Sequence, residues 1–338
     1  MASTTVSTPN YARRITWLGV AIGFFVLVYT AAWFFAAHEA EKRMDIELVK
    51  VNAGDTKITC DNRHVKGYPF RFGLFCDGET FIDEAKGIFI SSGALRTAAQ
   101  VYNPWHAIAE LDGPVKVAIP GVPTITANWS LLHSSIRFDQ PVPQRVSVEA
   151  NELNISVNKT AKESQQALTA TYAAGHMRSE DKDVSFAGEV DGLVIDPAIT
   201  PNRTIPEFAA SYDVLLKDGV AIAAAKPRDI KAALRGQSGE LRSVSLIFKD
   251  GGAVRVTGPL KLSVEGLLDG DIKLTFTDAA KLGVALGQAF PEAAKIIINT
   301  LTAASLGAGA DKEASLTLTI RRGKVSAGFF PIATIPPL

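Results

Sequence analysis

Residues 241–277 read LRSVSLIFKDGGAVRVTGPLKLSVEGLLDGDIKLTFT and alternate apolar and polar side chains along almost their whole length. Because successive side chains of a β-strand point to opposite faces of the sheet, this alternation predicts strands with one apolar and one polar face. The odd positions are mainly polar, with Ile247 and Leu267 as exceptions. The apolar even positions are Val244, Leu246, Phe248, Val254, Val256, Leu260, Leu262, Val264, Leu268, Ile272, Leu274 and Phe276.

The loops between these strands decide whether the even positions share one face. A two-residue loop would shift the parity of the following strand, whereas a loop of odd length preserves it. DGG at 250–252 and DGD at 269–271 are both predicted as three-residue loops with Gly in the left-handed conformation. The stretch is therefore predicted to be an antiparallel meander with one continuous apolar face.

The same alternation extends toward the N-terminus. From Val51 to about Phe276, segments such as PVKVAIP and QRVSVEANELNISV are separated by DG, GP, PG and NP dipeptides, which are typical of turns. No strand–helix–strand rhythm occurs, so we predict a mainly β fold with a large antiparallel sheet.

One region after the meander has helical spacing instead. DAAKLGVALGQAFPEAAKIIINTLTAASLG (278–307) is predicted as a helical pair, with Asp278 as N-cap, Pro291 starting the second helix and Gly307 ending it. The pair is expected to pack on the meander. It would either complete an ordinary core or form one wall of a groove whose floor is the sheet. A final hairpin, ASLTLTIRRGKVSAGFF, follows.

The N-terminal region holds an uncharged run, ITWLGVAIGFFVLVYTAAWFFAA, at 15–37. As a helix it is about 35 Å long, enough to cross a hydrocarbon core of about 30 Å. The run exceeds the roughly 7–15 apolar residues of a cleaved signal peptide, so we interpret it as an uncleaved signal anchor. The predicted organisation is a tail (1–14), a transmembrane helix (15–37), a juxtamembrane helix (38–50) and a β-rich domain (51–338).

The only cysteines, Cys60 and Cys76, enclose CDNRHVKGYPFRFGLFC. Its even positions from 68 onward are apolar or aromatic, which predicts a strand, and TKITC places Cys60 at the end of another. In an oxidising compartment two such sulfurs on neighbouring strands form a disulfide. Two free thiols are the alternative. Fifteen intervening residues do not fit a CxxC redox motif, and a zinc site would lack ligands.

Composition and motifs argue against several classes of protein. The 35 basic and 35 acidic residues balance, so no electrostatic footprint for nucleic acid is present. The five histidines are scattered, and no GxSxG, P-loop or GxGxxG motif occurs. We expect no enzyme activity, no metal and no cofactor.

GYPFRFGLFCDG, together with Cys60, the later VYNPWHAIAELDGP and the N-terminal apolar run, resembles domain-of-unknown-function family 2125. That family consists of membrane-anchored envelope proteins of Gram-negative bacteria. The resemblance implies a single inner-membrane helix with residues 1–14 in the cytoplasm and 51–338 in the periplasm. More loosely, the alternating strands are similar to AsmA-like proteins, which are β-rich and associated with phospholipid movement. Neither resemblance supplies catalytic residues.

Two functions fit this pattern. The first is binding of phospholipid or another hydrophobic ligand by the apolar sheet face, in envelope maintenance or lipid movement, since burial stabilises each acyl methylene by about 0.8 kcal/mol without any charged site. The alternative is a non-enzymatic scaffold of envelope machinery without bound lipid, in which Tyr102–Trp105 or the C-terminal IPPL contacts a protein partner. The candidate lipid-facing residues are Val256, Leu260, Leu262, Val264, Ile272, Leu274 and Phe276.

Overall fold

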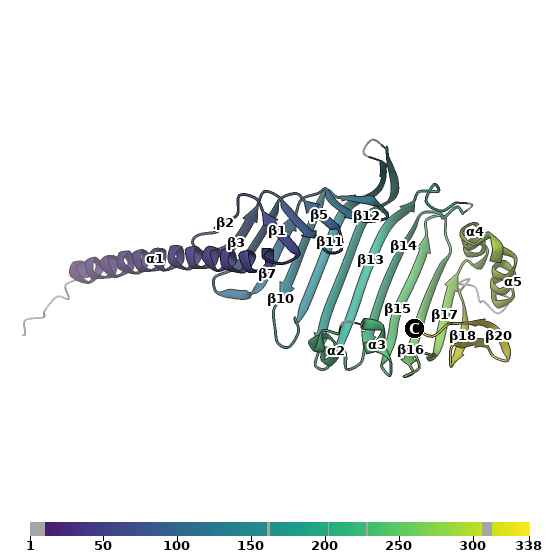
Figure 1. Ribbon diagram of the computed structural model, residues 1–338. Helices are drawn as coiled ribbons and strands as arrows, with labels where there is room; N and C mark the ends of the chain where they lie inside the picture. The colour runs from purple at the N-terminus through teal and green to yellow at the C-terminus, as the bar shows by residue number, and fades with distance from the viewer. Residues whose placement is uncertain (1–10, 161–162, 202, 228, 306–312) are drawn as a thin grey trace, which may run out of the picture.

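The computed structural model describes residues 11–160, 163–201, 203–227, 229–305 and 313–338. A long N-terminal helix leads into one large antiparallel sheet, and helices lie against the other end of that sheet (Figure 1). The predicted fold class, mainly β with an apolar N-terminal helix and C-terminal helices on the sheet, is confirmed.

Helix α1 (Tyr11–Asn52) joins the predicted span and juxtamembrane helix in one continuous element. It contains a window long and apolar enough to cross a membrane. Its C-terminal half lies along the first strand, where the Val65 amide donates to Glu41 Oε1 at 2.7 Å and the Asn52 side chain bonds both backbone groups of Ile58. The helix therefore covers backbone groups that an edge strand would expose.

The first ten strands are the halves of five long, interrupted strands. β1 pairs with β4 and β2 with β3, and the same double pairing continues along the chain until β9 and β10 both pair with β11. Their bounds are β1 (Thr56–Cys60), β2 (His64–Lys66), β3 (Arg71–Cys76), β4 (Glu79–Asp83), β5 (Ile88–Ser92), β6 (Leu95–Gln100), β7 (Asn103–Leu111), β8 (Val115–Ile119), β9 (Val122–Asn128) and β10 (Leu131–Arg137).

The interruptions lie next to one another across the sheet and define a fold line at 61–63, 77–78, 93–94, 112–114 and 129–130. Irregularities of this kind can reset the alternation of side chains while the sheet continues. Two glycines allow close approach here. A Cβ on Gly93 would lie 2.8 Å from the Asp112 carbonyl oxygen, and one on Gly113 would lie 2.3 Å from Asn128 Oδ1.

Beyond the fold line the chain continues as an up-and-down meander, with each strand paired to its sequence neighbours. The strands are β11 (Arg145–Thr160), β12 (Glu163–Glu180), β13 (Asp183–Ile195), β14 (Phe208–Leu216), β15 (Ser238–Phe248), β16 (Ala253–Leu262), β17 (Leu268–Thr277), β18 (Glu313–Arg321), β19 (Lys324–Ala327) and β20 (Phe330–Thr334).

The meander predicted for 241–277 is present, with one loop misplaced. Leu246 lies opposite Val254, and Val254 lies opposite Phe276, so the even positions share a face. DGG belongs to the turn at 249–252, as expected. DGD lies inside β17 instead, and the chain turns at 263–267. That turn also has an odd number of residues, so the predicted parity survives the error.

The helical pair after the meander begins where it was predicted, but the boundary between its two helices differs from the prediction. α4 (Ala279–Ala289) begins at Asp278, whose carboxylate accepts the Lys281 amide at 3.3 Å. Pro291 starts a 3-10 turn rather than the second helix, and α5 spans Ala294–Ser305. The predicted stop at Gly307 lies outside the described residues. Two short helices, α2 (Gly219–Ala225) and α3 (Ile230–Leu234), interrupt the predicted β region.

Two hydrophobic clusters lie on the apolar side of the last strands. In the first, Leu282 of α4 is only 1 % exposed and packs with Phe248 and Phe276. In the second, Ile272 and Ile320 pack with neighbours that include Ile335 of the C-terminal segment. The helices and the C-terminal segment therefore cover opposite ends of the same strands.

Candidate functional site

One face of the sheet is apolar from the strands beside α1 to the C-terminal end, and we call it the apolar face. Its continuity is visible in two rows of directly opposed residues, each row crossing the strands. The first row is Phe72, Ala99, Ala107, Ile136, Val146, Met177, Phe186, Val214 and Leu241.

The second row runs beside the first and reaches farther toward the C-terminus. It consists of Val148, Gly175, Gly188, Tyr212, Val244, Val256, Leu274 and Leu316. At about 4.8 Å per strand, the two rows together extend for about 50 Å. Such a length matches an extended apolar ligand better than a compact polar one.

A cavity of about 330 Å³ opens on the apolar face across β12 to β16. Two glycines of the second row contribute no side chains beside it, and the Tyr212 ring lies over one of them, since a Cβ on Gly188 would be 2.6 Å from Tyr212 Cε1. Ligand cavities commonly hold about 300–1,000 Å³ and are lined mainly by apolar groups. The polar residues that line this one are Glu189, Ser211 and Ser245. Its other lining residues are Ala174, Val190, Ala210, Tyr212, Val244, Leu246, Val254 and Val256.

The seven predicted lipid-facing residues occupy three different environments. Val256, Leu260, Leu262 and Leu274 are half-buried on the apolar face, and of these only Val256 lines the cavity. Val256 and Leu260 also pack against the cluster of Ile272 and Ile320. Ile272 and Phe276 are buried in the two hydrophobic clusters. Val264 lies in the turn at 263–267 and is 73 % exposed. The candidate set therefore divides into surface, core and turn.

The residues that β13 and β14 contribute to the cavity were not predicted from the sequence. Val190, Ala210 and Tyr212 stand opposite the meander because β14 pairs with β15. Their segments, DVSFAGEV and AASYDVLL, carry the period-two alternation that would have identified them as strands. These residues lie near Val244 only because β14 pairs with β15, and residues 217–237 separate these two strands in the sequence.

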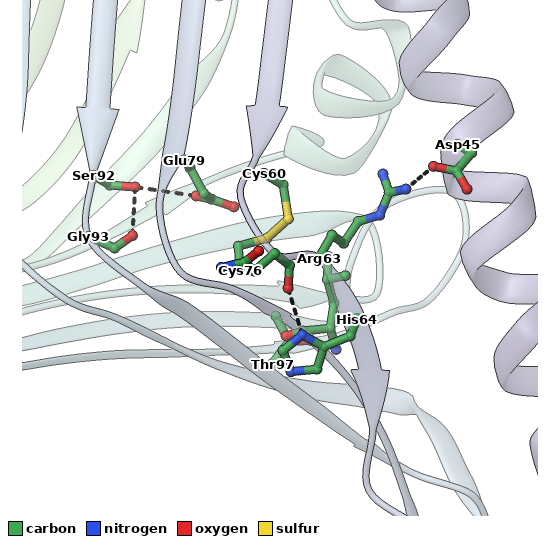
Figure 2. The surroundings of a disulfide bond; sticks show 11 residues. Asp45, Cys60, Arg63, His64, Cys76, Glu79, Ser92, Gly93 and Thr97 are labelled. Carbon is green, nitrogen blue, oxygen red and sulfur yellow. Dashed lines mark hydrogen bonds and ion pairs between the residues drawn. A yellow bond between two sulfur atoms is a disulfide. The ribbon is translucent and has the colours of Figure 1, made fainter.

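Cys60 and Cys76 form a disulfide across the first hairpin, at the fold line (Figure 2). Glu79, opposite Cys60 in the ladder, accepts a hydrogen bond from the Ser92 hydroxyl at 3.5 Å. Burial raises the pKa of the Glu79 carboxyl, and the Ser92 hydrogen bond only partly opposes this. On the other side, Arg63 pairs with Asp45 of α1.

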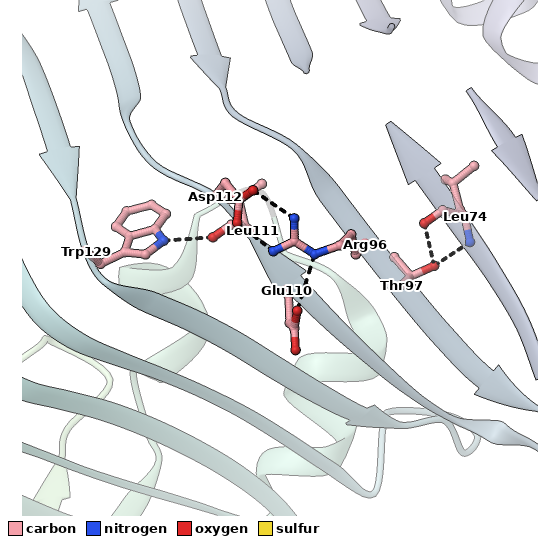
Figure 3. A network of polar contacts seen from close by, with 7 residues as sticks. All are labelled: Leu74, Arg96, Thr97, Glu110, Leu111, Asp112 and Trp129. Carbon is pink, nitrogen blue, oxygen red and sulfur yellow. Dashed lines mark hydrogen bonds and ion pairs between the residues drawn. The ribbon is translucent and has the colours of Figure 1, made fainter. Parts of the chain in front are cut away.

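A polar network follows the fold line (Figure 3). The Arg96 guanidinium donates to both oxygens of Asp112, at 2.7 and 2.6 Å, and to Glu110 at 3.3 Å. The hydrogen bond from Arg96 lowers the pKa of the Asp112 carboxyl. Trp129 Nε1 donates to the Leu111 carbonyl at 2.7 Å. These contacts hold neighbouring strands together where the ladder is interrupted.

Among the described residues, no group of three or more His, Cys, Asp or Glu side chains could hold a metal ion. The histidine nearest the disulfide, His64, stacks on Phe75 at 5.6 Å between ring centroids. That ring contact gives His64 a packing role in the first hairpin.

Comparison with known proteins identifies one family. The model of a family described as "Uncharacterized protein conserved in bacteria (DUF2125)" matches residues 33–336. The match includes the last part of the apolar run, the fold line, the cavity and the C-terminal strands. No curated protein and no solved structure matches the chain.

Proposed function

The chain belongs to the DUF2125 family, and we propose that it is a non-enzymatic, membrane-anchored envelope protein that binds phospholipid acyl chains on its apolar face. The family description names no activity, so the proposal comes from this chain's own residues. Acyl chains are the occupant that an extended surface without convergent charges suits best.

The observation that carries the proposal is the exposed middle of the apolar face. A sheet with one apolar face is ordinarily covered by a second layer. Here Val148, Phe186 and Tyr212, which lie in the two rows, each remain more than 40 % exposed. Helices α4 and α5 pack at the distal margin of the sheet, where Leu282 of α4 contacts Phe248 of β15 and Phe276 of β17. A bound acyl chain would remove this surface from water at about 25 cal/mol per Å².

We place the protein at the bacterial inner membrane, with α1 as an uncleaved single-pass anchor and the sheet in the periplasm. The apolar window of α1 supports the anchor. The Cys60–Cys76 disulfide supports the periplasm, because such bonds persist in oxidising compartments and are rare in the cytosol. In this arrangement the apolar face extends from the membrane into the periplasm, and the membrane is the source of the phospholipid.

Site-specific photocrosslinking of the full chain in native membranes tests the proposal. A benzophenone amino acid replaces Tyr212 on the apolar face or, as the control, Ile247 on the opposite face, where it is 52 % exposed. After irradiation, mass spectrometry identifies adducts on the labelled peptide. We expect phospholipid adducts at position 212 and none at 247. Equal lipid labelling at both positions, or none at either, would contradict binding on this face.

The scaffold alternative predicts a different result in the same experiment. It expects a protein adduct in place of lipid, with labelling favoured at an exposed aromatic site such as Tyr102, which is 74 % exposed. A single defined protein captured at 102, with no lipid at 212, would replace the lipid-binding proposal.

A further inference from the structure

Contacts between α1 and the loop before β3 set the depth of that loop relative to the apolar run. Thr30 Oγ1 lies 2.7 Å from Tyr68 Oη, and Tyr29 donates to the Pro69 carbonyl. The Trp33 ring, 5 % exposed, stacks on Phe72 at 5.0 Å between centroids. These helix residues precede the end of the apolar run at Ala37 by about 6–12 Å along the axis.

This depth coincides with the boundary of a bilayer. The apolar run of about 35 Å exceeds a hydrocarbon core of about 30 Å, so its last turns reach the interface. Any loop packed on Thr30 and Trp33 lies at the same level. The loop before β3 is therefore held where headgroups and acyl chains meet, provided that α1 spans the membrane.

Exposed aromatic side chains gather at this level. Phe70 is 65 % exposed, and its carbonyl accepts the Val101 amide at 3.0 Å, which places the turn between β6 and β7 beside it. That turn and the start of β7 carry Tyr102 and Trp105, 74 % and 68 % exposed. In a wholly aqueous setting such a group would be an unexplained apolar patch, whereas Trp and Tyr are enriched at membrane interfaces.

We propose that Tyr68, Phe70, Tyr102 and Trp105 form an aromatic collar seated in the lipid interface around the emerging end of α1. The proposal rests on α1 being a transmembrane anchor, as argued above. Arg71 adds a positive charge beside these aromatic residues. Its side chain is exposed, and no ion pair to it occurs among the described residues. A cation at this depth pairs with lipid phosphates.

The collar would determine where a lipid enters. Phe72, the first member of the first row, is the second residue of β3 after the collar loop and contacts Trp33 of α1. An acyl chain leaving the outer leaflet at the collar would therefore meet the apolar face without crossing a polar surface. From Phe72 the first row continues across the strands toward the cavity on β12 to β16.

Depth-dependent quenching on the full chain tests the collar. Single cysteines replace Tyr102 in the collar, Leu18 in the apolar window or Ile247 on the polar face of β15, and each is labelled with an environment-sensitive dye. The native cysteines are bonded to each other and do not react. The labelled chains are reconstituted into phosphatidylethanolamine–phosphatidylglycerol vesicles that contain a nitroxide-labelled phospholipid.

We expect the nitroxide lipid to remove most of the emission at positions 18 and 102 and to leave position 247 unchanged. The collar is overturned if position 102 behaves like 247 while 18 is quenched, because the anchor then spans the bilayer without the loops. If position 18 also escapes quenching, the anchor itself fails and the collar fails with it. Phe70→Cys provides a second collar position should Tyr102→Cys not fold.

Discussion

The two ends of the sheet are held together by different means. Beside α1, the strands that cross the fold line are held by a disulfide, a bidentate ion pair and an aromatic stack on Trp33. Both hydrophobic clusters lie in the other part, on β15 to β19. The strands beside α1 depend on specific bonds, and the distal strands on burial at their margins. Between them, the middle of the apolar face is fully covered by neither.

The largest loss of stability is expected from a substitution at Leu282, the most buried side chain of the distal clusters. Leu282→Ala should destabilise the chain by about 2–5 kcal/mol, because a cavity remains between Phe248 and Phe276. Denaturant unfolding of the full chain measures this. Val284→Ala on the same helix is the control, since Val284 is exposed. Similar losses in both variants would contradict a core under α4.

Removing the disulfide should weaken the other end. Replacing Cys60 and Cys76 by Ala should cost about 3 kcal/mol in the chain-entropy view of a loop of this size. Hydrogen exchange should increase in β1 to β4 and stay unchanged in β15 to β18, because the two ends share no cluster. An equal increase along the whole sheet would show that the two ends unfold as one unit.

A charge placed on the apolar face should reduce lipid capture without disturbing either end. Val244→Asp adds a carboxylate at the wall of the cavity, outside both hydrophobic clusters, and should lower photocrosslinking from position 212 by about tenfold, or about 1.4 kcal/mol. Arg255→Asp, on the opposite face of the neighbouring strand β16, should leave it unchanged. Equal crosslinking in both variants would mean that the lipid does not occupy this part of the face.

The smallest effect is expected at Glu79. Because its pKa is raised in the folded chain, the unfolded chain ionises first as the pH rises, so the folded state loses stability between the unfolded and the folded pKa. Glu79→Gln removes this cost and should raise the melting temperature slightly at pH 7. At pH values below the unfolded pKa the variant and the parent should melt together. A gain of equal size at both pH values would rule out this titration as the cause.

Much of the fold at the end of the sheet far from α1 could be predicted, because each sequence pattern there depends on residues close together in the chain. The alternation from Val244 to Phe276 predicted the meander and its apolar face, and Asp278 predicted the start of α4. The loop at 269–271 was misplaced because Gly in a DG pair also fits inside a strand, as it does in β17. Helices α2 and α3 were missed because each is too short to show a helical period.

The fold line could not be predicted from short stretches of sequence. The interruptions at 61–63, 77–78, 93–94 and 112–114 are short polar or Gly-containing segments that, taken alone, resemble ordinary turns, whereas the one at 129–130 is Trp–Ser. Only the pairing of β1 with β4 and of β2 with β3 shows that the chain continues in the same direction through 61–63 and 77–78. The same limit applies to the candidate site, because Tyr212 joins Val244 and Val256 only through the pairing of β14, β15 and β16.

The sequence by itself therefore determined which side chains are apolar at period two, where a membrane helix fits and which cysteines are available to bond. These properties depend on composition and on spacing within a few residues. Tertiary structure alone decided that Ile272 and Phe276 are core, that Val264 sits in a turn and that a cavity opens over β12 to β16. Those outcomes depend on strand register and on which elements cover the sheet, and both are set by contacts between residues far apart in the chain.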